Sequence, residues 1–476
     1  KNYFFSHSRM GKFKPVTTEQ LFLLPPSIED FIPAGHLARV INDVVETIDV
    51  TEIESRYSFL GQKSYPPHLL LKLLFYGYSI GVRSGRKIAS ACEQDTAFMY
   101  LSSMYKPDFR TLNDFRKNNT AFIQQSFIHV VQLCKGLGMA RAGMLILDGT
   151  KLKANASAGK TKNKEQYEQW VERIDADIKN ILDEAARTDE QEDKQYGNKR
   201  GDELPKELRS KQKLKEKIKQ VLEQMSSKKE RINLTDNEAK YIKNKGCIDL
   251  NYNCQAAITE DGIIVGAYTS NNCSDRVETM KSVNTAEQNT GDQYAEILAD
   301  SGFATYDNFE ELHNRNKTIF IPDQQMNTET GKEQNPYHRN HFVYNKEKDC
   351  FICPQNKELA FYGTSVHQRS KQRSKVYKCK ACQTCEKQPL CTKGNYRQIH
   401  VEEREPLRQQ IRERLNSKEG KLKYFKRMRI ESIFGNIKHN LNYIHLYMQG
   451  IAKTTAEWQL ICIGHNLKKI HQFKIT

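Results

Sequence analysis

The chain has 476 residues, and its 74 Lys and Arg outnumber 58 Asp and Glu, giving a formal net charge of +16. This length allows two or three domains with a large core, and the basic excess suits a protein that follows a phosphate backbone better than a small-molecule enzyme. No apolar run reaches the length of a membrane span and no signal peptide opens the chain, so we expect a soluble intracellular protein whose twelve cysteines are thiols or metal ligands.

The first 135 residues are predicted to be helical. Apolar side chains recur at helical spacing over 37–48, and residues 68–82, after Pro66 and Pro67, are apolar nearly all round and must be buried. Short helices follow over 84–119, with Ser84 and Asp108 at N-cap positions. Basic side chains gather in this stretch: Arg83, Arg86, Lys87, Arg110, Arg116 and Lys117. Two interpretations fit, a helix-turn-helix-like DNA contact and a helical bundle with a solvated basic face.

A buried strand is predicted from Met144, because an apolar run to Leu147 is followed by alternation as far as Ala154. Asp148 comes where this run ends, and an acid there points out of the sheet edge, where catalytic groups of open sheets lie. The alternative is an ordinary turn aspartate before Gly149.

Residues 160–245 are rich in Lys, Glu and Gln and contain two helical apolar stripes separated by YGNKRGDELP. We expect a long antiparallel helical hairpin inserted into the sheet domain. DNA contact, dimerisation and a solvated structural arm all remain open as its role.

The sheet is predicted to resume with strands at 254–259 and 263–270 joined by a turn, followed by a strand at 297–299, a helix near 305–314 and a strand at 318–321. Asp300 follows the third of these strands directly and is a second candidate site acid. Asp275, in NNCSDRVETM, is interpreted as a helix cap.

Six cysteines crowd into about forty residues as C-x2-C and C-x2-C-x2-C-x5-C: Cys350, Cys353, Cys379, Cys382, Cys385 and Cys391. Pairs of this spacing suit tetrahedral Zn²⁺, because each pair can chelate from one turn. Six candidates for four positions leave the assignment open, and free thiols are the alternative.

The segment YFKRMRIESIFGNIKHNL, residues 424–441, is predicted to be one helix packed on a core. At roughly 100° per residue, Tyr424, Arg427, Glu431 and Lys438 fall within an arc of about 60° at the edge of its apolar face. Such a stripe suits a polyanion together with a metal ion. A solvated charged face is the alternative.

The spacing Y-x2-R-x3-E-x6-K of these four residues resembles the signature around the last acid of DDE transposases of the insertion-sequence four superfamily. The surrounding IESIFGNIKHNL and AEWQLICIGHNLKKI are more similar to the insertion-sequence eleven-eighty-two group, and the resemblance extends over nearly the whole chain. It implies a multidomain α/β protein with a ribonuclease-H-like catalytic core, which the predicted order of strands and helices also suits. The implied domains are a helical DNA-binding domain (1–135), a core in three pieces (136–159, 246–325 and 415–476), the charged helical hairpin (160–245) and a Cys-rich, zinc-binding insertion (326–414).

The resemblance also implies roles for individual residues. Asp148, Asp300 and Glu431 would be catalytic and bind two Mg²⁺ or Mn²⁺ ions. The residues expected to contact DNA are Tyr424, Arg427, Lys438, Arg86, Lys87, Arg110 and Arg116. The cysteines similar to those of the family, and so favoured for one structural zinc, are Cys353, Cys382, Cys385 and Cys391.

The expected function is metal-dependent cleavage of double-stranded DNA at inverted-repeat ends and strand transfer into target DNA, by a protein located in the bacterial cytoplasm at the nucleoid. A homodimer is expected because two ends must be brought together. Two alternatives stay open: a non-catalytic, sequence-specific DNA-binding protein derived from a transposase, and a ribonuclease-H-like nuclease without strand transfer.

Overall fold

The computed structural model describes residues 27–57, 63–196, 206–244, 246–323, 336–366 and 373–475. The first 26 residues of the predicted helical domain and the segments 326–335 and 367–372 of the Cys-rich insertion lie outside these ranges. Among the described residues, no helix combines the length and the apolar character that crossing a bilayer requires.

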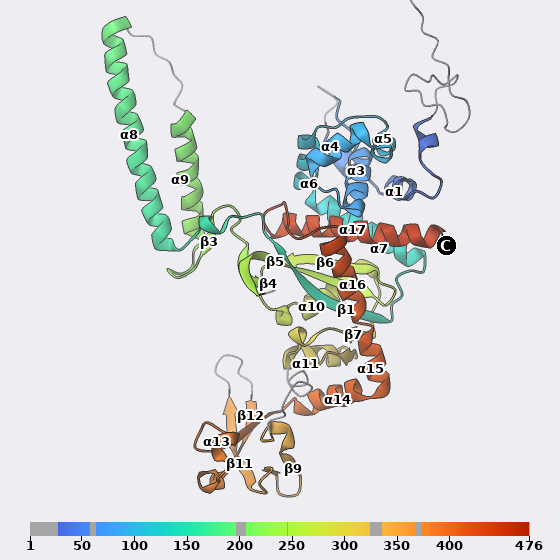
Figure 1. Cartoon of the computed structure of the whole chain (residues 1–476), viewed down its shortest axis with the longest axis vertical. Coiled ribbons are helices and arrows are strands. Elements are labelled where there is room, and N and C mark those ends of the chain that lie inside the picture. The colour runs from blue at the N-terminus through green and yellow to red at the C-terminus, as the bar shows by residue number, and fades with distance from the viewer. Residues whose placement is uncertain are drawn as a thin grey trace, which may run out of the picture.

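The N-terminal part is helical, as predicted (Figure 1). Its helices are α1 (Leu37–Glu46), α2 (Thr51–Glu54), α3 (Pro67–Ile80), α4 (Gly85–Gln94), α5 (Thr96–Leu101), α6 (Phe109–Asn118) and α7 (Thr120–Gly136). Helix α3 starts at Pro67 and ends at Gly81, whose φ of 85° is the left-handed cap conformation that glycine favours. Asp108 caps α6 by accepting from the Arg110 N–H, whereas Ser84 occupies the cap position of α4 without a side-chain bond.

A six-stranded mixed sheet forms the centre of the molecule. Its strands are β1 (Met144–Lys153), β4 (Lys240–Asn244), β5 (Cys247–Thr259), β6 (Ile264–Ser270), β7 (Glu296–Leu298) and β8 (Thr318–Phe320). The order is β4-β5-β1-β7-β8, and β6 also pairs with β5. Strand β5 runs antiparallel to β1, β4 and β6, whereas β1, β7 and β8 are parallel, so the carboxyl ends of β1 and β7 point the same way.

Helices α10 (Thr279–Thr290) and α11 (Tyr306–Asn314) connect β6 to β7 and β7 to β8. Helix α17 (Ile451–Ile475) runs between the helical part and the sheet and contacts α3, α7 and β6 (Figure 1). Its Trp458 is fully buried and donates from Nε1 to the Gln255 carbonyl on β5 at 2.8 Å. Its His465 is a packing residue whose Nε2 hydrogen-bonds with the Gly262 carbonyl at 2.9 Å. One helix therefore joins the two parts of the molecule.

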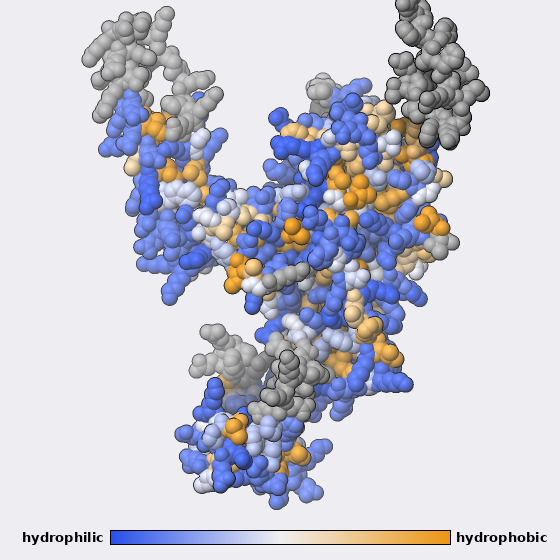
Figure 2. Space-filling model, viewed as in Figure 1, coloured by the Kyte–Doolittle hydropathy of each residue, from blue (hydrophilic) through white to orange (hydrophobic). Residues whose placement is uncertain are grey.

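The predicted helical hairpin is present as α8 (Lys164–Tyr196) and α9 (Lys206–Gln224), and its connecting segment 197–205 lies outside the described residues. The hairpin projects from the body beside the short strands β2 (Thr161–Lys162) and β3 (Ile232–Asn233), and its described surface is largely hydrophilic (Figures 1 and 2). A small apolar core that includes Tyr167, Ile174 and Ile218 holds the two helices together.

The Cys-rich segment contains an antiparallel five-stranded sheet in the order β13-β12-β11-β10-β9. Its elements are β9 (Val343–Asn345), β10 (Cys350–Ile352), β11 (Glu358–Val366), β12 (Arg373–Lys378), α13 (Gln388–Cys391) and β13 (Gln398–Glu402). The segment also contains the short 3₁₀ turns η5 (Arg339–His341) and η6 (Lys380–Thr384). Similar turns outside it are η1 (Ile28–Phe31), η2 (Ala158–Lys160), η3 (Asp275–Val277) and η4 (Ser301–Phe303).

The prediction of one helix over 424–441 is wrong. After α14 (Glu405–Asn416), the chain forms α15 (Lys418–Phe425) and α16 (Met428–Gly435), and then the π-helical turn η7 (Asn436–Asn440). The break lies at Lys426 and Arg427. Two contacts to Glu260 explain the break. Lys426 forms a 2.6 Å ion pair with the Glu260 carboxylate, and Arg429 donates to the Glu260 carbonyl. Together these contacts hold the chain against the β5–β6 turn.

Candidate active site

Asp148 lies inside β1, which continues past it to Lys153 instead of turning at Gly149. Its Oδ1 accepts the Gly149 N–H at 2.7 Å. Burial, and next the charge of Asp300, raise the pKa of Asp148 to about 7, against the opposing effects of the Gly149 N–H and of Arg427. Asp148 is therefore half-buried among other charges of the candidate site.

Asp300 comes two residues after β7, the parallel neighbour of β1. It is the N-cap of η4, and its Oδ1 accepts the Gly302 N–H at 2.8 Å. Because the charge of Asp300 acts on Asp148, the two acids predicted from separate strands lie near each other at one sheet edge.

Arg427 links Glu431 to Asp148, since its charge acts on both carboxylates. Its guanidinium forms a 2.6 Å ion pair with Glu431 and lies 5.6 Å from the ring centroid of Tyr424. The charge of Asp300 also acts on Tyr424. Arg427 Nε is buried and has no hydrogen-bond partner within the described part of the chain. This N–H is a ready donor for an anionic ligand.

Lys438 contacts the strand that carries Asp148. Its Nζ donates to the Lys151 carbonyl on β1 at 3.0 Å. The contacts among Tyr424, Arg427 and Glu431 keep this part of the predicted stripe together, and Lys438 lies after the break, on the π-helical turn η7.

The acids are not arranged as a closed metal site. Among the described residues, no group of three or more His, Cys, Asp or Glu side chains is placed to hold a metal ion. Glu431 is paired with Arg427, and its side chain is 49% exposed. The donor set nonetheless fits a divalent cation, because the like charge of Asp300 beside the half-buried Asp148 calls for a positive counter-ion. Binding by all three acids requires Glu431 to turn away from Arg427.

Asp275 is not a helix cap, because Ser274 caps η3 with its own side chain. The Asp275 carboxylate instead forms a 3.0 Å ion pair with Lys151 on β1 and accepts from the amides of Asn253 and Gln255 on β5, both at 2.7 Å. This polar cluster next to Gly149 was not predicted. Its only trace in the sequence is the alternation of the polar Asn251, Asn253 and Gln255 with less polar residues in NYNCQAAIT.

The basic residues of the helical part separate into two groups. Arg86, Lys87 and Arg110 are exposed, and Arg86 lies over the Phe109 ring at 4.6 Å. Arg116, also predicted to contact DNA, is 8% exposed and donates to Tyr78 Oη, the Arg83 carbonyl and Asn113 Oδ1. That prediction is corrected: the Arg116 guanidinium is a core group of this domain.

Five cysteines line one cavity of about 20 Å³: Cys353, Cys379, Cys382, Cys385 and Cys391. Four of them are the predicted zinc ligands, and Cys379 is an additional one. The Lys357 N–H donates to Cys353 Sγ at 3.2 Å, and the Arg397 N–H donates to Cys382 Sγ at 3.4 Å. A set of sulfur donors supported by main-chain N–H groups is one that Zn²⁺ favours, so these residues fit zinc, although the described side chains are not gathered around a metal position.

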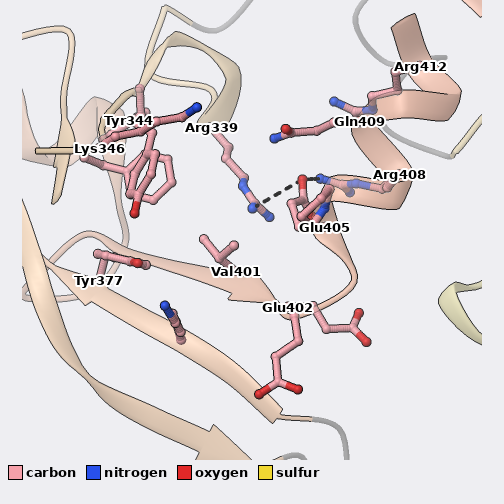
Figure 3. A pocket seen from close by; sticks show the side chains of 15 residues that line it. Arg339, Tyr344, Lys346, Tyr377, Val401, Glu402, Glu405, Arg408, Gln409 and Arg412 are labelled. Carbon is pink, nitrogen blue, oxygen red and sulfur yellow. Dashed lines mark hydrogen bonds and ion pairs between the residues drawn. The ribbon is translucent and has the colours of Figure 1, made fainter. Parts of the chain in front are cut away.

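A larger cavity, of about 750 Å³, separates the Cys-rich sheet from α14 (Figure 3). Tyr344 and Tyr377 lie on the sheet side. On α14, Glu405 is 3.7 Å from Arg339, is paired with Arg408, and accepts from Tyr306 Oη at 2.6 Å. None of the three predicted catalytic acids lines this cavity, so it is separate from the candidate active site.

Two protein families match parts of the chain. Residues 352–471 match the family described as Transposase DDE domain, and residues 26–118 match the family described as Transposase domain (DUF772). The first match includes Glu431 and the cysteines, and neither match reaches Asp148 or Asp300. No curated protein matches the chain. Together the two matches indicate a transposase of the DDE type.

Proposed function

We propose that this protein is a DDE transposase that cleaves double-stranded DNA at the inverted-repeat ends of its own element and transfers the ends to target DNA. The observation that carries the proposal is the convergence of Asp148, Asp300 and the Arg427–Glu431 pair from β1, β7 and α16 at one edge of the sheet. Both family matches support it from independent parts of the chain.

A ribonuclease-H-like core is the fold that we propose for the sheet domain. Support comes from the spatial order β6-β5-β1-β7-β8, in which an antiparallel meander of three strands is followed by two strands parallel to the first, with α10 and α11 as connections. The similarity to the insertion-sequence eleven-eighty-two group rests on the sequence motifs alone.

The three acids, Arg427 and Tyr424 have distinct roles in this proposal. Asp148, Asp300 and Glu431 would hold two Mg²⁺ or Mn²⁺ ions, which supply an activated attacking oxygen and stabilise the leaving oxygen when bound. Arg427 would release Glu431 and direct its buried Nε–H to a DNA phosphate. Tyr424 would pack against the sugar or base at the same position.

The remaining parts would serve recognition and stability. Arg86, Lys87 and Arg110 are exposed and would contact the duplex backbone, and Lys438 would contact it as well. Four of the five cysteines would hold one structural zinc, with Cys353, Cys382, Cys385 and Cys391 as our assignment. A homodimer would bring two ends together.

The test is cleavage of labelled DNA that carries the element's own ends, with Mg²⁺ or with EDTA. We expect metal-dependent cutting by the parent chain and its loss in Asp148→Ala, Asp300→Ala and Glu431→Gln, with end binding retained. Glu419→Gln on α15 is the matched control, because its side chain is 80% exposed and its carboxylate pairs with Lys423 on the same helix, away from the three acids. Binding without cutting by the parent would favour the non-catalytic DNA-binding protein, and cutting without joining of pre-cleaved ends would favour a simple nuclease.

A further inference from the structure

Asp275 is tied to two strands of the sheet from one side. Its carboxylate receives the Lys151 ammonium of β1 at 3.0 Å and the amide nitrogens of Asn253 and Gln255 of β5, each at 2.7 Å. The side chains of Asp275 and Lys151 are only 18% and 16% exposed. A carboxylate held by three donors in a half-buried setting has a fixed position.

Gly149 makes room for this network. It pairs with Gln255, and Lys151 pairs with Asn253, so these four residues share one face of the β1–β5 pair. Asp148, next to Gly149, points to the other face. A Cβ at Gly149 would lie 2.6 Å from Asp275 Oδ1 and 2.7 Å from Asn253 Oδ1, and closer still to Gln255 Nε2. The network therefore packs directly against the back of the strand that carries Asp148.

Two atoms of the network have no partner. Asn253 and Gln255 are fully buried and both turn their nitrogens to Asp275, which leaves Asn253 Oδ1 and Gln255 Oε1 without hydrogen bonds among the described residues. Buried acceptors without donors are destabilising, so stability alone does not account for these two amides. What they do achieve is the fixation of one carboxylate.

Lys151 makes a second contact, through its main chain. The Lys151 carbonyl accepts from Lys438, which follows α16, while the Lys151 side chain binds Asp275. The stretch of β1 from Asp148 to Lys151 is thus held between η3 and the segment that carries Glu431.

We infer that Asp275 is a positioning residue for the reaction, which fixes the β1 main chain through Lys151, Asn253 and Gln255 and thereby aligns Asp148 with Asp300 for metal binding. The inference rests on the proposed function. Asp275 contacts neither metal nor DNA in this role; it acts through the strand.

The experiment compares the parent chain with Asp275→Asn and with Asp292→Asn. Asp292 is a matched control, because it also pairs with one lysine, Lys135, at 2.8 Å and is 25% exposed, but lies before β7 at the opposite end of that strand from Asp300. Mn²⁺ binding without DNA is measured by electron paramagnetic resonance. Thermal unfolding, DNA-end affinity and the metal dependence of cleavage are measured on the same preparations.

For Asp275→Asn we expect an Mn²⁺ Kd at least fivefold higher and cleavage at saturating metal at least tenfold slower, with end affinity within twofold of the parent. Gln255→Leu removes one donor and one unpaired oxygen together. Like Asp275→Asn, this variant should have a higher Mn²⁺ Kd than the parent, but its unfolding temperature should not fall. A purely structural role of the network does not predict this combination.

Two outcomes would contradict the inference in different ways. In the first outcome, the parent binds Mn²⁺ and cuts DNA, and Asp275→Asn has the same Mn²⁺ affinity and cleavage rate as Asp292→Asn. Asp275 then has no positioning role, even if Asp275→Asn unfolds at a lower temperature. If the parent neither binds Mn²⁺ nor cuts, the proposed function fails, and the inference fails with it.

Discussion

Replacing Gly149 by alanine tests the packing behind Asp148 with the smallest possible change. The added methyl group would come within 2.7 Å of both Asp275 and Asn253 oxygens, so at least one donor must leave the carboxylate. Overpacking of this kind costs about 1–3 kcal/mol. A lost hydrogen bond to a charged group adds about 1.5–3 kcal/mol. Alanine also reduces the backbone freedom of the unfolded chain, which stabilises the folded state by only about 0.4–1 kcal/mol.

The expected net loss of unfolding free energy is therefore about 2–5 kcal/mol, which corresponds to a fall of roughly 5–15 °C in the first thermal transition. Differential scanning calorimetry measures it. Gly143→Ala is the matched control: it is the same substitution just before the same strand, and a Cβ there meets no atom within 4 Å. We also expect cleavage of transposon-end DNA to slow at least tenfold in Gly149→Ala only. Equal melting temperatures for the two variants would refute the tight packing that we describe.

Four further predictions concern other parts of the molecule. Glu457→Ala should lose about 3–5 kcal/mol of unfolding free energy in urea titrations, because its buried carboxylate accepts from two main-chain N–H groups beside buried arginines, and Glu457→Gln should lose less. Burial lowers the pKa of His465 to about 4, so between pH 6.5 and 4 the unfolded chain binds the extra proton; stability is complete above this range and falls by about 3 kcal/mol through it, and His465→Gln should remove that part of the pH dependence. Arg86→Gln should reduce the slope of log Kd for DNA against log salt by about 0.9, whereas Arg116→Met should lower the melting temperature and leave the slope unchanged. Elemental analysis should find about one zinc per chain and none in Cys382→Ser, and a metal-free parent would exclude the structural zinc.

The elements that the sequence predicts well are those with one strongly buried face. The strand at Met144 and the helix at Pro67 have apolar patterns set directly by burial, and both were found where expected. The Cys-rich sheet has no such pattern. Most of β11 is exposed, so its residues do not alternate and the cysteine spacing is the only signal in that segment.

Tertiary contacts explain what was mispredicted around the site. The break at Arg427 involves neither Gly nor Pro and depends on Glu260, which is more than 160 positions away in the chain. Local capping rules favoured Asp275 as a cap, but its partners lie on β1 and β5. For Arg116, a basic residue in the last turn of a short helix was taken for a surface cation, and its internal acceptors could not be seen in the sequence.

The position of α17 has a consequence for how the protein is made. This helix covers α3, α7 and β6, yet it is translated after all of them. Until it emerges from the ribosome, the apolar residues that it covers on the helical part and on the sheet stay exposed. Chaperones and proteases can bind these two surfaces during that time. Asp148 and Asp300 are also translated before Glu431 and α17. The three candidate acids therefore come together only after most of the chain has been translated.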